Sequence, residues 1–457
     1  MVTTLGVVDE KLVEALRTSL RGPLITPSDA AYDEARKVWN GMIDRHPAMI
    51  ARVAGAADVV TCVHFARDTG IILSVRGGAH NVQGNAVCDN GLVIDCSGMK
   101  AIRVDPAQRR VRAEPGVKWG EFDREVQAFG LATTSGTFSD TGIAGLTLGG
   151  GMGWLGGRFG LASDNVLSFD VVTADGRLRT ASEAEEPDLF WALRGGGGNF
   201  GVVTSFEYRL HPVGTLLAGA VFYPFDQARE VLRFYRDFAR DIPDELVTGF
   251  GFLTLPDGTR AVAIAVVYNG PQDAGEQMIR PLREFGQPLV DEIGPMPYTA
   301  VQTMFDPLAP TGRHYYVKSP YLREIQDGAV EALVDRFAEV PSPFTILFLQ
   351  QKSGAMARGP ADRTAFGHRE DQFAANLISG WDDPAQTEAN IAWTRQLARD
   401  LEPFGAGGEY INELGPTDSA DHIRASFGAN YARLAALKEQ WDPTNLFRYT
   451  QNLTPTT

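Results

Sequence analysis

An arginine and a histidine lie together in a glycine-rich segment, Ser74-Val75-Arg76-Gly77-Gly78-Ala79-His80, directly after the apolar run at residues 70–73. This order predicts a buried strand that ends in a turn, where backbone N–H groups, a guanidinium and an imidazole are presented together. Glycines let backbone amides approach an anion such as a pyrophosphate closely. The segment therefore predicts an anion site with a reactive imidazole beside it.

Two more glycine-rich loops follow in the same half of the chain, at residues 142–153 and 195–201. Neither meets the dinucleotide fingerprint, which needs G-x-G-x-x-G between a strand and a helix and an acidic residue about 20 positions on, and neither has a P-loop lysine. A flexible turn or close helix packing stays an alternative for each loop taken alone. Together with Arg76 and His80, the three loops predict one large ligand held mainly by the backbone.

The elements that would position these loops are short. Apolar periodicity and turn residues predict helices at 119–129 and 187–193, a hairpin with arms 102–104 and 111–113, and strands at 71–75, 169–173 and 202–210. The composition changes after residue 212, where we expect a domain boundary. Beyond it the pattern predicts strands at 220–222, 249–253, 261–267, 344–350 and 373–378, and helices at 227–240, 273–285, 329–338 and 386–401. This alternation predicts an α+β fold with one antiparallel sheet covered by helices on one side.

Composition narrows the class of protein. A chain of 457 residues favours two domains, and its net charge of −15 argues against nucleic acid as a partner. The sequence has no signal-peptide pattern at its start and no apolar segment long enough for a membrane span, so we expect a cytoplasmic protein. Its cysteines, Cys62, Cys88 and Cys96, lack CxxC spacing, which argues against disulfides and against a zinc site. No metal is expected, and the oligomeric state is left open.

The residues 75–81 closely resemble the R-x-G-G-H motif of the berberine-bridge-enzyme-like flavoproteins, in the vanillyl-alcohol-oxidase fold group, with Ala79 in place of the last glycine. Further blocks of that family are matched at 161–165, 188–204 and, near the end of the chain, 430–434, 442–448 and 451–452. The resemblance covers nearly the whole chain and is weakest over 213–405. It implies a two-part FAD-binding domain of PCMH type at 1–212, a substrate-binding domain at 213–415, and a C-terminal segment at 416–457 that returns to the first domain.

The same resemblance implies FAD bonded covalently through His80. Phe138 occupies the position at which many relatives carry a second linking cysteine, so we expect a single link. The implied contacts of FAD are Arg76, Gly77, Gly78, Ala79, His80, Asn81, Asp140, Thr141, Gly142, Ala144, Gly145, Gly150, Gly196, Asn199, Gly201, Val202, Asn445 and Gln451. Thr141 is a small residue at the position of the oxygen gate, which favours an oxidase.

Oxidation of an alcohol or amine needs a base for the O–H or N–H proton while hydride leaves to the flavin. Relatives that oxidise alcohols and carbohydrates use a tyrosine in a Tyr-x-Asn block, here Tyr410-Ile411-Asn412-Glu413, which makes Tyr410 the catalytic candidate. A base role requires a nearby cation to lower the pKa of Tyr410. The alternative is that Tyr410 packs against the flavin and only donates a hydrogen bond. Glu413 replaces the second aromatic residue that is common in relatives.

The sheet strands of the second domain carry polar residues that could form a pocket floor: Tyr315, Tyr316, Lys318, Gln350 and Lys352. The leading hypothesis is an oxidase that transfers hydride from an alcohol, sugar or secondary-metabolite substrate to covalent FAD and then to O2. The alternative is a flavin-dependent oxidative cyclase or tailoring enzyme of natural-product biosynthesis. A non-catalytic flavin-binding protein is the third reading.

Overall fold

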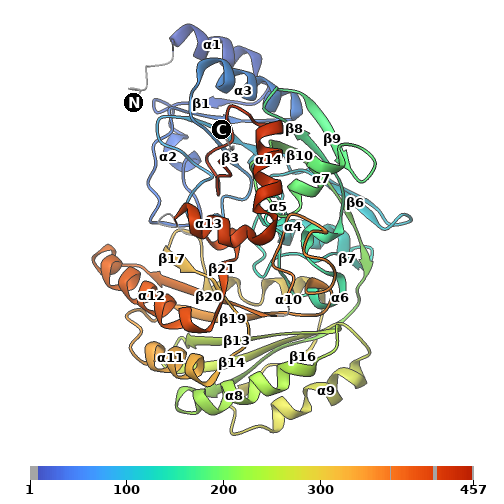
Figure 1. The fold of residues 1–457 in the computed structure, drawn as a ribbon, viewed down its shortest axis with the longest axis vertical. Coiled ribbons are helices and arrows are strands. Elements are labelled where there is room, and N and C mark those ends of the chain that lie inside the picture. The colour runs from blue at the N-terminus through green and yellow to red at the C-terminus, as the bar shows by residue number, and fades with distance from the viewer. Residues whose placement is uncertain (1–8, 371, 415–418, 455–457) are drawn as a thin grey trace.

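The computed structural model describes residues 9–370, 372–414 and 419–454. Figure 1 shows two parts, one above the other along the long axis of the molecule, with a large antiparallel sheet in the lower part and smaller sheets in the upper part. In the described residues no helix has both the length and the apolar character needed to cross a bilayer.

The first half builds two larger sheets and the two-stranded sheet β7–β11. One has the order β1-β2-β4-β3, in which β2, β4 and β3 are parallel, and it packs on α1 and α3 through Leu16, Val59 and Val63. The other has the order β5-β6-β10-β8-β9 and is antiparallel throughout. The elements up to residue 212 are α1 (Glu10–Ser19), β1 (Leu24–Ile25), α2 (Tyr32–Ala35), β2 (Met49–Arg52), α3 (Ala56–Thr69), β3 (Leu73–Arg76), β4 (Leu92–Asp95), β5 (Ile102–Asp105), β6 (Arg110–Ala113), α4 (Trp119–Gln127), β7 (Leu131–Ala132), α5 (Ile143–Leu148), α6 (Gly156–Phe159), β8 (Val166–Val172), β9 (Leu178–Ser182), α7 (Pro187–Leu193), β10 (Val202–Arg209) and β11 (His211–Pro212).

The second half forms a sheet that has ten strands in the described residues, ordered β15-β12-β14-β13-β19-β20-β18-β21, with β16 on β12 and β17 on β20. All of its pairings are antiparallel. Its elements are β12 (Leu216–Pro224), α8 (Ala228–Phe238), β13 (Leu246–Thr254), β14 (Arg260–Tyr268), α9 (Gln272–Glu284), β15 (Val290–Asp291), β16 (Gly294–Met296), α10 (Tyr298–Thr303), β17 (His314–Lys318), β18 (Pro320–Leu322), α11 (Asp327–Ala338), β19 (Ile346–Lys352), β20 (Gln372–Trp381), α12 (Thr387–Leu401) and β21 (Gly405–Glu409).

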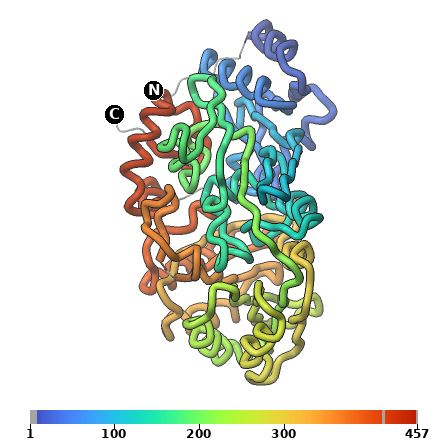
Figure 2. Tube along the Cα trace, turned by 90° about the vertical axis from the view of Figure 1, so that its right-hand side faces the viewer, coloured from blue at the N-terminus to red at the C-terminus, as the bar shows by residue number. Residues whose placement is uncertain are grey.

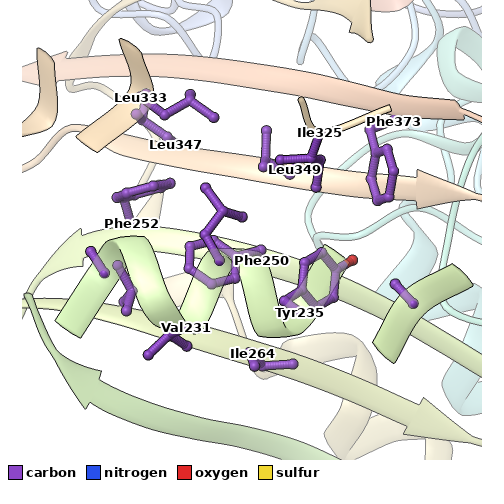
Figure 3. Packing of buried hydrophobic residues seen from close by; sticks show 14 of the residues in the cluster. Val231, Tyr235, Phe250, Phe252, Ile264, Ile325, Leu333, Leu347, Leu349 and Phe373 are labelled. Atoms are coloured by element: carbon purple, nitrogen blue, oxygen red, sulfur yellow. The ribbon is translucent and has the colours of Figure 1, made fainter. Parts of the chain in front are cut away.

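Alternate residues of this sheet face opposite layers. On β14, Val262, Ile264 and Val266 point toward α8 and α11, whereas Ala263 and Ala265 point toward the first half of the chain. Figure 3 shows the helix-covered face, where Tyr235 of α8 packs against Phe250 of β13 with a ring-centroid distance of 5.5 Å. The period-2 pattern thus assigns one face to the core and leaves the other for a site.

The tail packs against the first half. Helices α13 (Ala420–Phe427) and α14 (Tyr431–Trp441) follow β21, and Leu434 and Leu437 of α14 join the core that contains Phe190 of α7. Figure 2, turned by 90° from Figure 1, shows the red tail beside the blue and green segments of the upper part. The α+β fold and the helix-covered antiparallel sheet are confirmed, whereas the exact domain division stays a prediction. The strand predicted at 344–350 is shifted and runs from Ile346 to Lys352.

Candidate active site

A cavity of about 410 Å³ lies between the glycine loops of the first half and the open face of the large sheet. The loops contribute residues 77–82, 141, 142, 144, 145, 197 and 198, and strands β12, β13, β14, β19 and β20 contribute the facing wall. The tail adds Tyr449 to Gln451 at one side. Segments that are far apart in the sequence therefore enclose one site.

His80 is held rigidly at this cavity. Its Nε2 lies 3.1 Å from Oδ1 of Asp140, and its ring stacks on Trp39 with a centroid distance of 4.4 Å. Trp39 in turn stacks on Tyr315 at 4.0 Å. In the described part of the chain the other ring nitrogen of His80, Nδ1, makes no hydrogen bond, so it is the nitrogen left for a ligand.

Asp140 is the partner that orients His80. Burial acts to raise the pKa of this carboxyl, but the hydrogen bond and charge of His80, helped by Lys118 and Thr311, outweigh it and lower the pKa. An ionised Asp140 favours a proton on Nε2 of His80, which keeps the lone pair of a neutral imidazole on Nδ1.

Two different structural reasons explain glycine at positions in these loops. A Cβ on Gly78 would lie 2.4 Å from Cα of Gly142, so these two loops touch backbone to backbone. A Cβ on Gly145 in α5 would meet nothing within 4 Å, although this residue lines the cavity. Its exposed backbone suits the close approach of a large ligand, and this cradle fits FAD.

Ala79, where the family motif has glycine, adopts φ of +59°. Left-handed backbone costs a non-glycine residue about 1–2 kcal/mol. The cost of this departure is therefore conformational, because the methyl group itself is accommodated in a buried position.

The predicted FAD contacts divide into two groups. Those that line the cavity are Gly77, Gly78, Ala79, His80, Asn81, Thr141, Gly142, Ala144, Gly145, Gly201, Val202 and Gln451. Those that lie off it are Arg76, Asp140, Gly150, Gly196, Asn199 and Asn445. Asp140 still acts on the site through His80.

Arg76 does not line this cavity, but it lines a neighbouring pocket together with His80 and Asp140. Its Nη1 donates to the carbonyl oxygen of Ala35, and its Nε lies 3.8 Å from Oδ1 of the buried Asp95. These partners direct the side chain away from the cavity because Arg76 still belongs to strand β3, where side chains alternate.

Asn199 acts on the tail. Its Nδ2 donates to the carbonyl oxygens of Gly196 at 2.8 Å and Gln451 at 3.1 Å, and its Oδ1 accepts from the N–H of Leu453. Nζ of Lys438, buried in an ion pair 2.6 Å from Oδ2 of Asp442, also donates to the carbonyl oxygen of Asn199. Asn199 therefore anchors Gln451 at the edge of the cavity.

Tyr410 reaches the cavity, where three hydrogen-bond donors surround its hydroxyl oxygen. Its Oη lies 3.1 Å from the N–H of Gly151, 3.3 Å from that of Met152, and 2.8 Å from Nδ2 of Asn412. These donors lower the pKa, but burial outweighs them and raises it to about 12. The raised pKa favours the neutral hydroxyl and thus the alternative in which Tyr410 donates a hydrogen bond, while its role as the base stays a prediction.

The polar residues predicted for the pocket floor are only partly on it. Gln350 lines the cavity. Lys318 lies 3.8 Å from Oε1 of Glu409, and Lys352 donates to the carbonyl oxygen of His368. Tyr315 lies behind Trp39, and the hydroxyl of Tyr316 accepts from Nε of Arg395 at 3.1 Å. The two lysines and two tyrosines thus surround the site without lining it.

Sequence reasoning missed Trp39, which lies 41 positions before His80 and belongs to no motif. It also missed the apolar wall, including Phe222, Ala263 and Phe348, and the fact that Glu413 faces the cavity. The only local signal among these was Glu413, an acidic residue in the place of an aromatic one.

Comparisons with known proteins agree with this geometry. Residues 47–182 match the family described as FAD binding domain, and residues 409–454 match the family described as berberine and berberine like. An FAD-linked oxidoreductase of Dictyostelium discoideum is 32% identical over 455 residues, which are 97% of each chain. The chain belongs to the berberine-bridge-enzyme-like FAD-linked oxidoreductases.

Other members of this berberine-bridge-like family align over the same length. The (R)-6-hydroxynicotine oxidase of Paenarthrobacter nicotinovorans is 31% identical and covers 96% of this chain and 97% of its own. The crystal structure of 6-hydroxy-D-nicotine oxidase from Arthrobacter nicotinovorans superimposes with a TM-score of 0.89 at 29% identity, covering both chains fully. Chitooligosaccharide oxidase, at 22% identity and a TM-score of 0.86, has the same fold. The predicted family and enzyme class are confirmed.

Proposed function

We propose that this berberine-bridge-like protein is an oxidase whose FAD is bonded covalently through His80 and whose substrate is a small organic alcohol, sugar or amine-bearing metabolite. FAD, when bound, supplies the hydride acceptor that O2 then reoxidises. The observation that carries the proposal is His80 at the cavity, with Nε2 engaged by Asp140, the ring stacked on Trp39, and Nδ1 facing no protein partner in the described residues.

A single link to FAD is expected. Phe138 lines the cavity at the position of the second linking cysteine, and a phenyl ring cannot form that bond. The thiols of Cys62, Cys88 and Cys96 are buried, and burial raises their pKa values, which makes them poor nucleophiles.

Tyr410 is proposed to donate a hydrogen bond to the reacting oxygen or nitrogen of the substrate. Two backbone N–H groups and the Asn412 amide already surround its oxygen, so the phenolic proton is left to point to the cavity. Thr141 also lines the cavity, and its small side chain supports oxygen access. A cytoplasmic location stays a prediction.

The experiment is the absorbance and fluorescence of acid-precipitated, washed protein, for wild type, His80→Ala and His46→Ala. His46 is an exposed histidine and serves as the matched control. We expect a yellow pellet from wild type and His46→Ala, and a colourless pellet from His80→Ala. A colourless wild-type pellet from a yellow native protein would refute the covalent link, and failure to bind any flavin would refute the function.

An oxidative cyclase or tailoring enzyme is the second candidate, and the apolar wall of the cavity favours it over a sugar oxidase. Oligosaccharides need many polar partners, whereas Phe222, Leu253 and Phe348 offer none. Product analysis decides between the two chemistries, since a simple oxidase gives a new carbonyl or imine and a cyclase gives a new ring. Peroxide release during turnover tests O2 as the acceptor in both cases.

A further inference from the structure

The cavity is lined by more acidic than basic side chains. Among the described residues that line it, the acidic ones are Glu292 and Glu413, the basic one is His80, and none is Lys or Arg. Glu292 is exposed, whereas Glu413 is half-buried on the short turn Ile411–Glu413 that carries Asn412. A half-buried carboxylate in an apolar cavity is expensive unless a partner compensates its charge.

Glu409 provides an internal comparison. This residue lies four positions before Glu413, and its Oε1 is 3.8 Å from Nζ of Lys318 and 3.4 Å from Nε2 of His422. The carboxylate of Glu413 has no hydrogen bond or ion pair in the part of the chain that the structure describes. The residues 415–418, which follow it, contain no Lys, Arg or His.

The surroundings of Glu413 also disfavour its charged form. Burial raises the pKa of its carboxyl; the charge of His80 opposes this, and that of Glu409 adds to it. His80 already shares its Nε2 with Asp140. The protein therefore leaves at Glu413 a position that a cationic group from outside would stabilise.

The rest of the wall defines the body of the ligand. Small and apolar side chains from two strands, Ala220 of β12 and Ala263 and Ala265 of β14, form a hollow bordered by Phe222 and Phe348. This part of the wall favours an aromatic or alicyclic body, while Gln350 and Asn376 are the polar side chains of the neighbouring strands β19 and β20.

We infer that the substrate is an apolar amine that binds as its ammonium ion, and that Glu413 is the carboxylate which selects it. This inference rests on the proposed function, because it names the substrate class of the same cavity. Glu413 acts as a specificity-determining residue through a charge-assisted hydrogen bond to the substrate N–H, while the hollow of the sheet receives the apolar body.

The test is the equilibrium binding of two nearly isosteric probes, 2-phenylethylamine and 2-phenylethanol, by calorimetry at pH 7. The holoenzyme is first reduced with dithionite, so that binding is measured without turnover. We expect wild type to bind the amine at least about tenfold more tightly than the alcohol, because hydrogen bonds to charged groups are the stronger ones. Glu413→Gln should lose this preference, and Glu292→Gln, which removes the exposed carboxylate, should keep it.

Reversing the charge at position 413 distinguishes loss of a ligand contact from simple misfolding of the Glu413→Gln variant. Glu413→Lys should prefer 3-phenylpropionate over 2-phenylethylamine if the position contacts the ligand. Equal binding of both probes by wild type, or an amine preference that survives in Glu413→Gln, would overturn the inference. Wild-type protein that keeps covalent flavin yet prefers the alcohol would overturn only this inference and leave the proposed function standing.

Discussion

Tyr410 and Glu413 lie three positions apart, yet their surroundings differ. Three N–H donors surround the oxygen of Tyr410, whereas Glu413 faces the cavity without such support in the described residues. A tyrosine whose pKa is about 12 cannot serve as a resting phenolate near neutral pH. At the scale of single residues, the raised pKa favours hydrogen-bond donation by Tyr410, and its role as the base stays a prediction.

The size of the rate loss in Tyr410→Phe distinguishes a hydrogen-bond donor from a general base. Loss of a neutral hydrogen bond costs about 0.5–1.5 kcal/mol, or about 2- to 12-fold in rate, whereas loss of a general base costs about 10²- to 10⁴-fold. We expect the smaller effect on the rate of anaerobic flavin reduction, measured by stopped flow. A loss of a thousandfold or more, with flavin content unchanged, would restore Tyr410 as the base.

At the scale of elements, helix α5 carries a glycine for which nothing in the protein accounts. Gly145 lies inside the helix, and a Cβ there would meet open space in the cavity. Alanine in place of glycine inside a helix stabilises it by about 0.5–1 kcal/mol. We therefore expect a ligand to approach the backbone at Gly145.

Accordingly, Gly145→Ala should raise the melting temperature of flavin-free protein while lowering the fraction of protein that incorporates FAD. Gly214→Ala is the matched control, because a Cβ there also meets nothing within 4 Å and the residue does not line the cavity. Flavin content from the visible absorbance of purified protein checks the result. Normal incorporation of FAD by Gly145→Ala would show that the ligand does not lie against α5.

The elements were largely predictable because their signals are local. The Asp105–Gln108 turn, the Asp257–Gly258 turn and the periodicity of β14 each depend on neighbouring residues. The site was less predictable, because whether a residue lines the cavity depends on the direction of its side chain. Arg76 and His80 share one motif, but only His80 faces the cavity, and Trp39 reaches it from a segment without any pattern.

At the scale of the whole molecule, a buried polar cluster joins the two halves. Asp123 of α4 accepts from Oγ of Ser135 at 3.2 Å, and Ser135 also bonds Tyr298 and Gln302 of α10. Burial raises the pKa of Asp123 well above its ordinary value, and its Oδ1 has no hydrogen-bond partner in the described residues. The folded protein therefore prefers the protonated carboxyl.

This preference makes stability depend on pH with a known sign. A raised folded-state pKa gives stability that is complete below about pH 4, the unfolded value of Asp, and is lost as pH rises toward the folded value. The loss is about 1.4 kcal/mol per pH unit in that window. Asp123→Asn, which mimics the protonated form, should remove it.

Urea unfolding of wild type and Asp123→Asn at pH 5, 6 and 7 measures the difference between their free energies of unfolding. We expect the free energy of unfolding of Asp123→Asn to rise relative to that of wild type as pH increases. Asp68→Asn, at an exposed position on α3, should show a constant difference. A parallel pH dependence of Asp123→Asn and wild type would mean that Asp123 is ionised in the folded protein.

The alternation of the large sheet has an evolutionary consequence. Because Val262, Ile264 and Val266 face the helices while Ala263 and Ala265 face the cavity, stability and specificity depend on alternate residues of one strand. Mutations at the second set can reshape the chamber without disturbing the layer that keeps the sheet folded. A scaffold of this kind can evolve new substrate specificity without losing stability, since the two properties depend on different residues.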